Sequence, residues 1–170
     1  MTEIQNAMEI IKKQEELLQF DHFNTDDAWE LGCFIVNEMK ERDICIAVAI
    51  RKLNGKIVFQ YVPDGTTSSN IHWMQKKFNM VSYLEKSSLL AGLDLISKGE
   101  TLTVHDLKSS EYVGCGGGFP IRVKGTGIVM VLTVSELPHV EDHGFIVDCL
   151  AKYLNVEVPV YRDDLPMLGE

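Results

Sequence analysis

One stretch of the chain, from Gly114 to His143, constrains the possible folds more than any other. It reads in order as a glycine-rich loop, a short apolar segment, a Lys-Gly-Thr-Gly turn, a longer apolar segment and a polar turn that leads into a helical pattern. Two apolar segments joined by a tight glycine-containing turn are typical of an antiparallel hairpin. We therefore predict strands at residues 119–123 and 128–135, followed by a last helix that Pro138 opens.

A second hairpin is predicted nearer the N-terminus. Residues 44–51 are almost all apolar, which is typical of a strand that is covered on both faces. The dipeptide Asn54-Gly55 is a strong hairpin signal, because both central positions of a type I′ turn need positive φ. Residues 57–62 then return as the second strand, and residues 101–105 have short strand character. About five strands in a mostly antiparallel sheet are therefore expected.

Helical spacing of apolar residues predicts helices before, between and after these strands. The patterns cover residues 3–20, Thr25 to Met39, Ile71 to Gly99 with a bend at Ser87-Ser88, and Pro138 to Leu154. Helices on both faces of such a sheet give an α/β (α+β) fold of the three-layer α-β-α sandwich type. We expect one sandwich domain over residues 1–155 and an extended or loosely docked tail over residues 156–170.

The composition limits the classes of partner. The net charge of -9 disfavours nucleic acid and anionic membranes, which both require a basic surface. No segment approaches the roughly 20 apolar residues that cross a bilayer, and the N-terminus lacks the features of a signal peptide. The four cysteines form no Cys-x-x-Cys pair, so no zinc or redox motif is predicted. We expect a reduced, cytoplasmic protein without a metal site.

The glycine-rich loop has two interpretations. Gly114-Cys-Gly116 begins like a dinucleotide-binding fingerprint, but position 119 is Phe, and the loop leads into a strand rather than into a helix whose N-terminus would hold a pyrophosphate. The glycines can serve a strand entry that needs positive φ or close backbone contact. Alternatively, the backbone amides of the loop line a ligand pocket.

Asp142 and His143 lie in the first turn of the predicted last helix. His143 precedes Ile146 and Val147 by three and four residues, so it shares their buried face. One interpretation is a carboxylate that favours the helix dipole beside a histidine at the edge of the core. The other is a pocket histidine that ligates iron or moves a proton, with Asp142 as its acid/base partner.

Asn70, Trp73 and Lys77 share one face of the preceding helical pattern at spacings of three and four residues. A planar anionic ligand can use this combination, because the ring stacks on the indole and the lysine pairs with the charge. The alternative is a solvated basic face on which the tryptophan packs against the core.

Several of these motifs together resemble one family. They are Asn54-Gly55 with Phe59-x-Tyr61, Pro63-Asp-Gly-Thr-Thr, Asn70-x-x-Trp73-x-x-x-Lys77, Ser87-Ser88, Gly117-Gly-Phe-Pro-Ile-x-Val123, Gly127, Thr133-Val-Ser135, Leu137-Pro138 and Asp142-His143. Over about residues 1–155, the chain resembles an uncharacterised family of small cytosolic proteins in the haem-degrading domain (GlcG/HbpS-like) superfamily. The resemblance implies a profilin-like sandwich with a five-stranded antiparallel sheet, usually in homo-oligomers, and some superfamily members bind haem or related tetrapyrroles.

The resemblance also implies site residues. The ligand-binding candidates are Asn70, Trp73, Lys77, Phe119, Pro120 and His143, and the candidates for catalysis are His143 and Asp142. The chain departs from the family pattern at Lys76, where arginine is usual, and at Met130 and Glu136, where glycines are usual. A bulkier strand residue and an added charge at the turn are expected to narrow or change a pocket.

Three functions are consistent with these residues. The first is a homo-oligomeric cytosolic domain that binds a small, tetrapyrrole-like ligand, with haem as the candidate cofactor. The second is a non-enzymatic module for protein interaction or scaffolding. The third is an enzyme that uses His143 and Asp142 as an acid/base pair.

Overall fold

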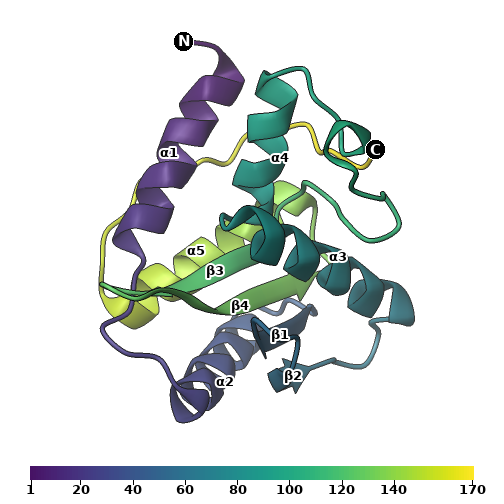
Figure 1. Ribbon diagram of the computed structural model, residues 1–170. Helices are drawn as coiled ribbons and strands as arrows, with labels where there is room; N and C mark the ends of the chain where they lie inside the picture. The colour runs from purple at the N-terminus through teal and green to yellow at the C-terminus, as the bar shows by residue number, and fades with distance from the viewer.

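The computed structural model describes all residues from 1 to 170 and has a mixed α/β fold (Figure 1). The helices are α1 (Glu3–Leu17), α2 (Thr25–Glu41), α3 (Ser68–Leu84), α4 (Ser88–Ser97) and α5 (His139–Leu154), with a 3₁₀ turn at Thr103–His105. The strands are β1 (Ala47–Lys52), β2 (Ile57–Tyr61), β3 (Gly118–Val123) and β4 (Gly127–Ser135). No helix has the length and apolar character needed to cross a membrane.

The four strands form one antiparallel sheet in the order β2-β1-β4-β3. Both predicted hairpins are confirmed, and the two inner strands join them through a register that runs from Ala47 opposite Ser135 to Lys52 opposite Met130. The turn of the first hairpin contains Gly55 at φ +90°, but Asn54 does not have positive φ, so the turn is not the type I′ turn that the Asn-Gly signal predicts.

The prediction of about five strands is wrong, because residues 101–105 form no strand. Leu102 is fully buried, and its N–H donates to the carbonyl oxygen of Glu170 at 3.0 Å. The next three residues form the 3₁₀ turn, which Asp106 ends in the left-handed conformation at φ +57°. Backbone groups in this segment that a neighbouring strand would have bonded are thus occupied by the hydrogen bond to Glu170 and by hydrogen bonds within the turn.

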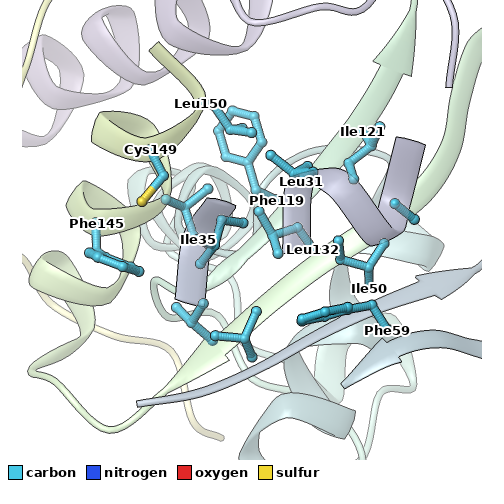
Figure 2. Packing of buried hydrophobic residues seen from close by; sticks show 14 of the residues in the cluster. Leu31, Ile35, Ile50, Phe59, Phe119, Ile121, Leu132, Phe145, Cys149 and Leu150 are labelled. Carbon is cyan, nitrogen blue, oxygen red and sulfur yellow. The ribbon is translucent and has the colours of Figure 1, made fainter. Parts of the chain in front are cut away.

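The two faces of the sheet are packed differently. On one face, Ile50, Phe119 and Leu132 contribute to the largest core cluster, together with side chains of α2 and α5 (Figure 2). On the other face, the small side chains of β1 pack with Met74 of α3, and Val131 of β4 packs with Phe78 of α3. Helix α3 therefore lies across the end of β4 that leads into α5, which brings the starts of both helices close together.

The long helical pattern from Ile71 to Gly99 is divided in two, and the expected bend is confirmed. Helix α3 ends at Glu85, which is left-handed at φ +57°. Helix α4 begins after Ser87, whose hydroxyl accepts a hydrogen bond from the N–H of Leu90. The N–H of Ser87 donates in turn to the carboxylate of Glu15 on α1, so the break is held by a tertiary contact.

Candidate functional site: a cleft between the starts of α3 and α5

A cleft of about 450 Å³ lies between the start of α3, the end of β4 and the start of α5. Met167 of the C-terminal tail also lines it. Asn70, Trp73, Lys77 and Asp142, which the sequence singled out, are all among its lining residues. Two stretches that are more than sixty residues apart in the sequence are therefore combined in one site.

The deepest part of the cleft is a buried ion pair between Lys77 of α3 and Asp142 of α5. The ammonium donates to Asp142 Oδ2 at 3.0 Å and to the carbonyl oxygen of Val134 at 2.9 Å. Asp142 Oδ1 accepts from the N–H of Leu137 at 3.1 Å. The two side chains are 3% and 2% exposed. Burial raises the pKa of the Asp142 carboxyl to about 6, although the Lys77 charge acts in the opposite direction.

Asn70 forms a second polar group at the rim. Its Nδ2 donates to Glu136 Oε2 at 2.7 Å and to the carbonyl oxygen of Ser135 at 3.3 Å. Its Oδ1 accepts from the N–H of Thr67 at 2.8 Å, which completes the capping box at the start of α3. Asn70 therefore fixes the first turn of α3 to the end of β4.

Trp73 is half-buried on the wall of the cleft, one helical turn before Lys77. The ammonium of Lys76 lies 4.5 Å from the centroid of the Trp73 ring, within the range of a cation–π contact. The two adjacent lysines therefore have different roles, since Lys77 is in the buried ion pair and Lys76 covers the indole.

Three predicted ligand-binding residues lie outside the lining of the cleft. Phe119 is fully buried in the core, and Pro120 is a buried residue of β3 opposite Val131. His143 is 3% exposed, with Nε2 2.8 Å from Gln14 Oε1, and its Nδ1 has no hydrogen-bond partner. Burial lowers the pKa of the His143 imidazole to about 4, so the ring is neutral at physiological pH.

Comparison with known proteins identifies the family. The family model HbpS-like, described as a haem degrading protein, matches residues 23–151. The chain belongs to the HbpS-like family. A UPF0303 protein of Rhizobium etli is 37% identical over 159 residues, which cover 94% of this chain and 96% of the relative.

Solved structures share the HbpS-like fold. The crystal structure of the Ybr137w protein has a TM-score of 0.78 and 27% sequence identity, with 87% of each chain covered. A PduOC–haem complex has a TM-score of 0.63 at 15% identity, covering 82% of this chain and 99% of the other. At 15% identity, the second likeness concerns the fold alone.

One cleft residue of this HbpS-like protein, His139, was missed by the sequence analysis. Its Nδ1 accepts from the N–H of Gly116 at 3.2 Å, and its Nε2 donates to the carbonyl oxygen of Leu165 at 2.7 Å. Burial lowers the pKa of His139. Its place directly after Pro138, in the first turn of the last predicted helix, was the available signal, but both of its hydrogen-bond partners are far away in the sequence.

The glycine-rich loop serves close packing, in agreement with the strand-entry interpretation. A Cβ on Gly116 would lie 1.9 Å from the carbonyl oxygen of His139. Gly117 has φ +120°, and a Cβ there would lie 2.6 Å from Lys77 Nζ. The loop nevertheless reaches the cleft through Cys115, whose thiol pKa is raised to about 11 by burial, so the thiol is protonated at physiological pH.

The departures from the family pattern have different positions in the HbpS-like protein. Met130 is buried in the core cluster shared with α2 and α5, and it does not line the cleft. Glu136 is an exposed residue of the cleft, where it accepts the hydrogen bond from Asn70. Of these two residues, only Glu136 therefore changes the charge of the cleft.

The donor set of the cleft does not fit a haem held through histidine. Both ring nitrogens of His139 are already bonded to backbone groups, and His143 lies outside the cleft. The apolar lining residues, Trp73, Cys115, Leu137 and Met167, form a minority of the cleft wall. The arrangement offers a surface for a flat ring and polar groups for its substituents, but no free imidazole for an iron atom.

Proposed function

We propose that this protein binds a small ligand with a flat ring in the cleft, and that the ligand is a tetrapyrrole. The observation that carries the proposal is the position of Trp73, a half-buried aromatic ring on the wall of a 450 Å³ cleft, next to the buried pair of Lys77 and Asp142. The family description as haem degrading, and the haem complex of PduOC, support tetrapyrroles as the ligand class.

The side chains of the cleft have separate roles in this proposal. The Trp73 ring stacks on the face of the macrocycle. An ammonium has three N–H groups, and Lys77 uses two of them within the protein, so one remains for a carboxylate of the ligand. The ring and its carboxylates are thus recognised without a bond from histidine to iron.

The remaining sequence predictions belong to the same proposal. We propose a cytoplasmic protein that forms homo-oligomers, with residues 1–155 as one profilin-like sandwich domain and residues 156–170 as a tail against it. The acid/base alternative loses its geometric basis, because Asp142 is paired with Lys77 and His143 with Gln14. The interaction-module alternative is supported by β2, an edge strand whose outer backbone groups have no hydrogen-bond partner in the chain.

The test compares the two tryptophans of the chain. Haem and metal-free protoporphyrin are titrated separately into the wild type, Trp73→Ala and Trp29→Ala, with absorbance and fluorescence as readouts. Trp73→Ala is expected to weaken binding about fivefold, because stacking on an indole contributes roughly 1 kcal/mol. Trp29 is 63% exposed and lies outside the cleft, so Trp29→Ala serves as the matched control with unchanged affinity.

The two ligands distinguish the mode of binding. Comparable affinity for haem and protoporphyrin is expected, since the cleft has no free imidazole. Failure of both ligands to bind at micromolar concentration, or an equal loss in both tryptophan variants, would overturn the proposal. Binding of haem alone would show that the iron is ligated and that recognition through the ring is wrong.

A further inference from the structure

A second pocket, of about 360 Å³, lies between the end of α2, one side of α5 and the C-terminal tail. We call it the arginine pocket, because Arg42 and Arg162 both line it. It shares only Leu137 with the cleft described above. Its volume lies within the range of pockets that hold one small molecule. The arginine pocket is therefore a separate candidate site with its own set of charged groups.

The two arginines of this pocket face the same carboxylate. Arg42 Nη1 and Arg162 Nη2 each lie 3.5 Å from an oxygen of Asp148. Arg42 has one further contact of the same length, to Glu38. These distances exceed the roughly 2.7–2.9 Å of strong charge-assisted hydrogen bonds. Most of the N–H groups of both guanidinium groups thus remain available to a carboxylate, which a guanidinium can bind bidentately.

A second acidic residue of the pocket has no partner. Glu141 lies two helical turns before Asp148 on α5, is exposed, and forms no ion pair in the chain. The charged lining residues are thus two arginines and two carboxylates, which balance. A ligand with one charge would disturb this balance, whereas a ligand with one positive and one negative group preserves it.

Apolar groups form the rest of the wall. Phe145 and Val140 of α5 are 4% and 7% exposed. The guanidinium of Arg42 lies 5.5 Å from the centroid of the Phe145 ring, which places a cation beside the apolar surface. Tyr161 of the tail is held by a hydrogen bond from its hydroxyl to Glu3 Oε1 at 3.0 Å. The wall therefore suits an apolar side chain next to a charged group.

Gly144 keeps this pocket open. Glycine inside a helix is unfavourable relative to alanine, so it usually has a packing reason. A Cβ on Gly32 or Gly92, the other two glycines inside helices, would lie 2.4 Å from an atom of a neighbouring segment. A Cβ on Gly144 would meet only Arg162 Nη1, at 4.0 Å. Gly144 lines the pocket, so its missing side chain leaves room for a ligand rather than for another part of the chain.

We propose that the arginine pocket binds a free α-amino acid with an apolar or aromatic side chain. The carboxylate of the amino acid lies between Arg42 and Arg162, its ammonium pairs with Glu141, and its side chain packs on Phe145. Because both charges are recognised, a peptide terminus, which presents only one of them, is a poorer ligand. The proposal does not depend on the binding of a tetrapyrrole, which uses the cleft.

The first test varies the ligand. L-phenylalanine and L-leucine are titrated into the full chain by isothermal titration calorimetry, and at least one is expected to bind at one site per chain. N-acetyl-L-phenylalanine lacks the ammonium and L-phenylalaninamide lacks the carboxylate, so each is expected to bind at least about tenfold more weakly than L-phenylalanine. Absence of binding by both amino acids at millimolar concentration, or equal binding of either derivative, would overturn the proposal.

The second test varies the charges of the pocket. Arg162→Gln and Glu141→Gln are each expected to lower the affinity about tenfold, because each removes one charge-assisted hydrogen-bonding group from the site. Lys124→Gln removes an exposed charge from the turn between β3 and β4, outside the pocket, and is expected to bind like the wild type. Unchanged affinity in both pocket variants would place the amino acid elsewhere.

The third test fills the pocket. Gly144→Leu is expected to abolish amino-acid binding while thermal stability is retained or raised, because leucine favours the helix and the new Cβ has no close contact. Retained stability separates a blocked pocket from a misfolded chain. The porphyrin titrations should be unchanged in this variant, since Gly144 does not line the cleft. Wild-type affinity for the amino acid in Gly144→Leu would show that the arginine pocket is not the site.

Discussion

At the scale of single residues, the chain places charged groups where water is nearly absent. Lys77 and Asp142 are each almost fully buried, and their contacts join α3, the end of β4 and the start of α5. A buried ion pair of this kind contributes little net stability compared with an apolar pair, but removal of one partner leaves an uncompensated charge. A substitution that removes one of the two charges is therefore expected to destabilise the fold more than one that removes both.

Neutralising one partner of this pair is expected to be costly. Asp142→Asn leaves the Lys77 ammonium buried opposite a neutral amide and should lower the free energy of unfolding by about 3 kcal/mol in urea denaturation. The double variant Lys77→Met with Asp142→Asn is expected to recover part of this loss, because it buries no unpaired charge. If the loss in the double variant equals the sum of the losses in Lys77→Met alone and Asp142→Asn alone, the two groups are not energetically coupled.

His143 gives the stability a defined pH dependence. The folded protein holds the ring neutral down to about pH 4, whereas an unfolded chain protonates it near pH 6.5. The contribution of the neutral His143 ring to the free energy of unfolding is therefore complete above pH 6.5. It is lost as the pH falls towards 4, by about 3 kcal/mol in total. The raised pKa of Asp142 acts with the opposite sign between about pH 4 and 6, so the wild-type curve alone does not isolate His143.

The measurement is the difference between the wild type and His143→Gln in urea denaturation from pH 7.5 to 4. Glutamine keeps a donor for Gln14 and has no titration in this range. The free energy of unfolding of the wild type is expected to decrease relative to that of the variant as the pH is lowered. Parallel curves would mean that His143 is protonated equally in the folded and unfolded states.

At the scale of elements, the sequence predicted those parts that depend on local spacing. The Asn54-Gly55 turn, the hairpin at 118–135 and the helical patterns are local signals, and they are present in the structure. The 3₁₀ turn at Thr103–His105 and the hydrogen bond of His139 to Leu165 were not predictable, because they depend on contacts with the C-terminal tail.

The tail is the element whose contribution was most underestimated. Gly114 and Leu168 exchange two backbone hydrogen bonds, of 2.7 and 2.9 Å, and Leu165 and Leu168 are buried. This pairing carries Met167 to the wall of the cleft. The tail is therefore expected to influence ligand binding as well as stability.

Met167→Ala tests this role without disturbing the core. Met167 and Val160 are each 46% exposed residues of the tail, but only Met167 lines the cleft. Met167→Ala should weaken porphyrin binding about fivefold through lost apolar contact, and Val160→Ala should leave it unchanged. Both variants should keep the free energy of unfolding within about 0.5 kcal/mol of the wild type. Equal affinities in the two variants would place the ligand away from the tail.

At the scale of the whole molecule, the cleft depends on how α3, the end of β4 and α5 pack together. The helical face of Asn70, Trp73 and Lys77 and the helix start at Asp142 were recognisable in the sequence, and the fold brings them together. The interpretation of His143 as a core histidine agrees with its burial, but the sequence pattern alone left this open. A residue on the buried stripe of a helix can face either a cavity or packed side chains, and only the tertiary arrangement decides between them.

The segment between β2 and α3 connects the edge strand of the sheet to the cleft. Asp64 flanks the exposed edge strand, while Gly65 and Thr67 line the cleft. A ligand in the cleft that contacts this segment binds residues continuous in the chain with β2, so its binding free energy also opposes local opening at that edge of the sheet.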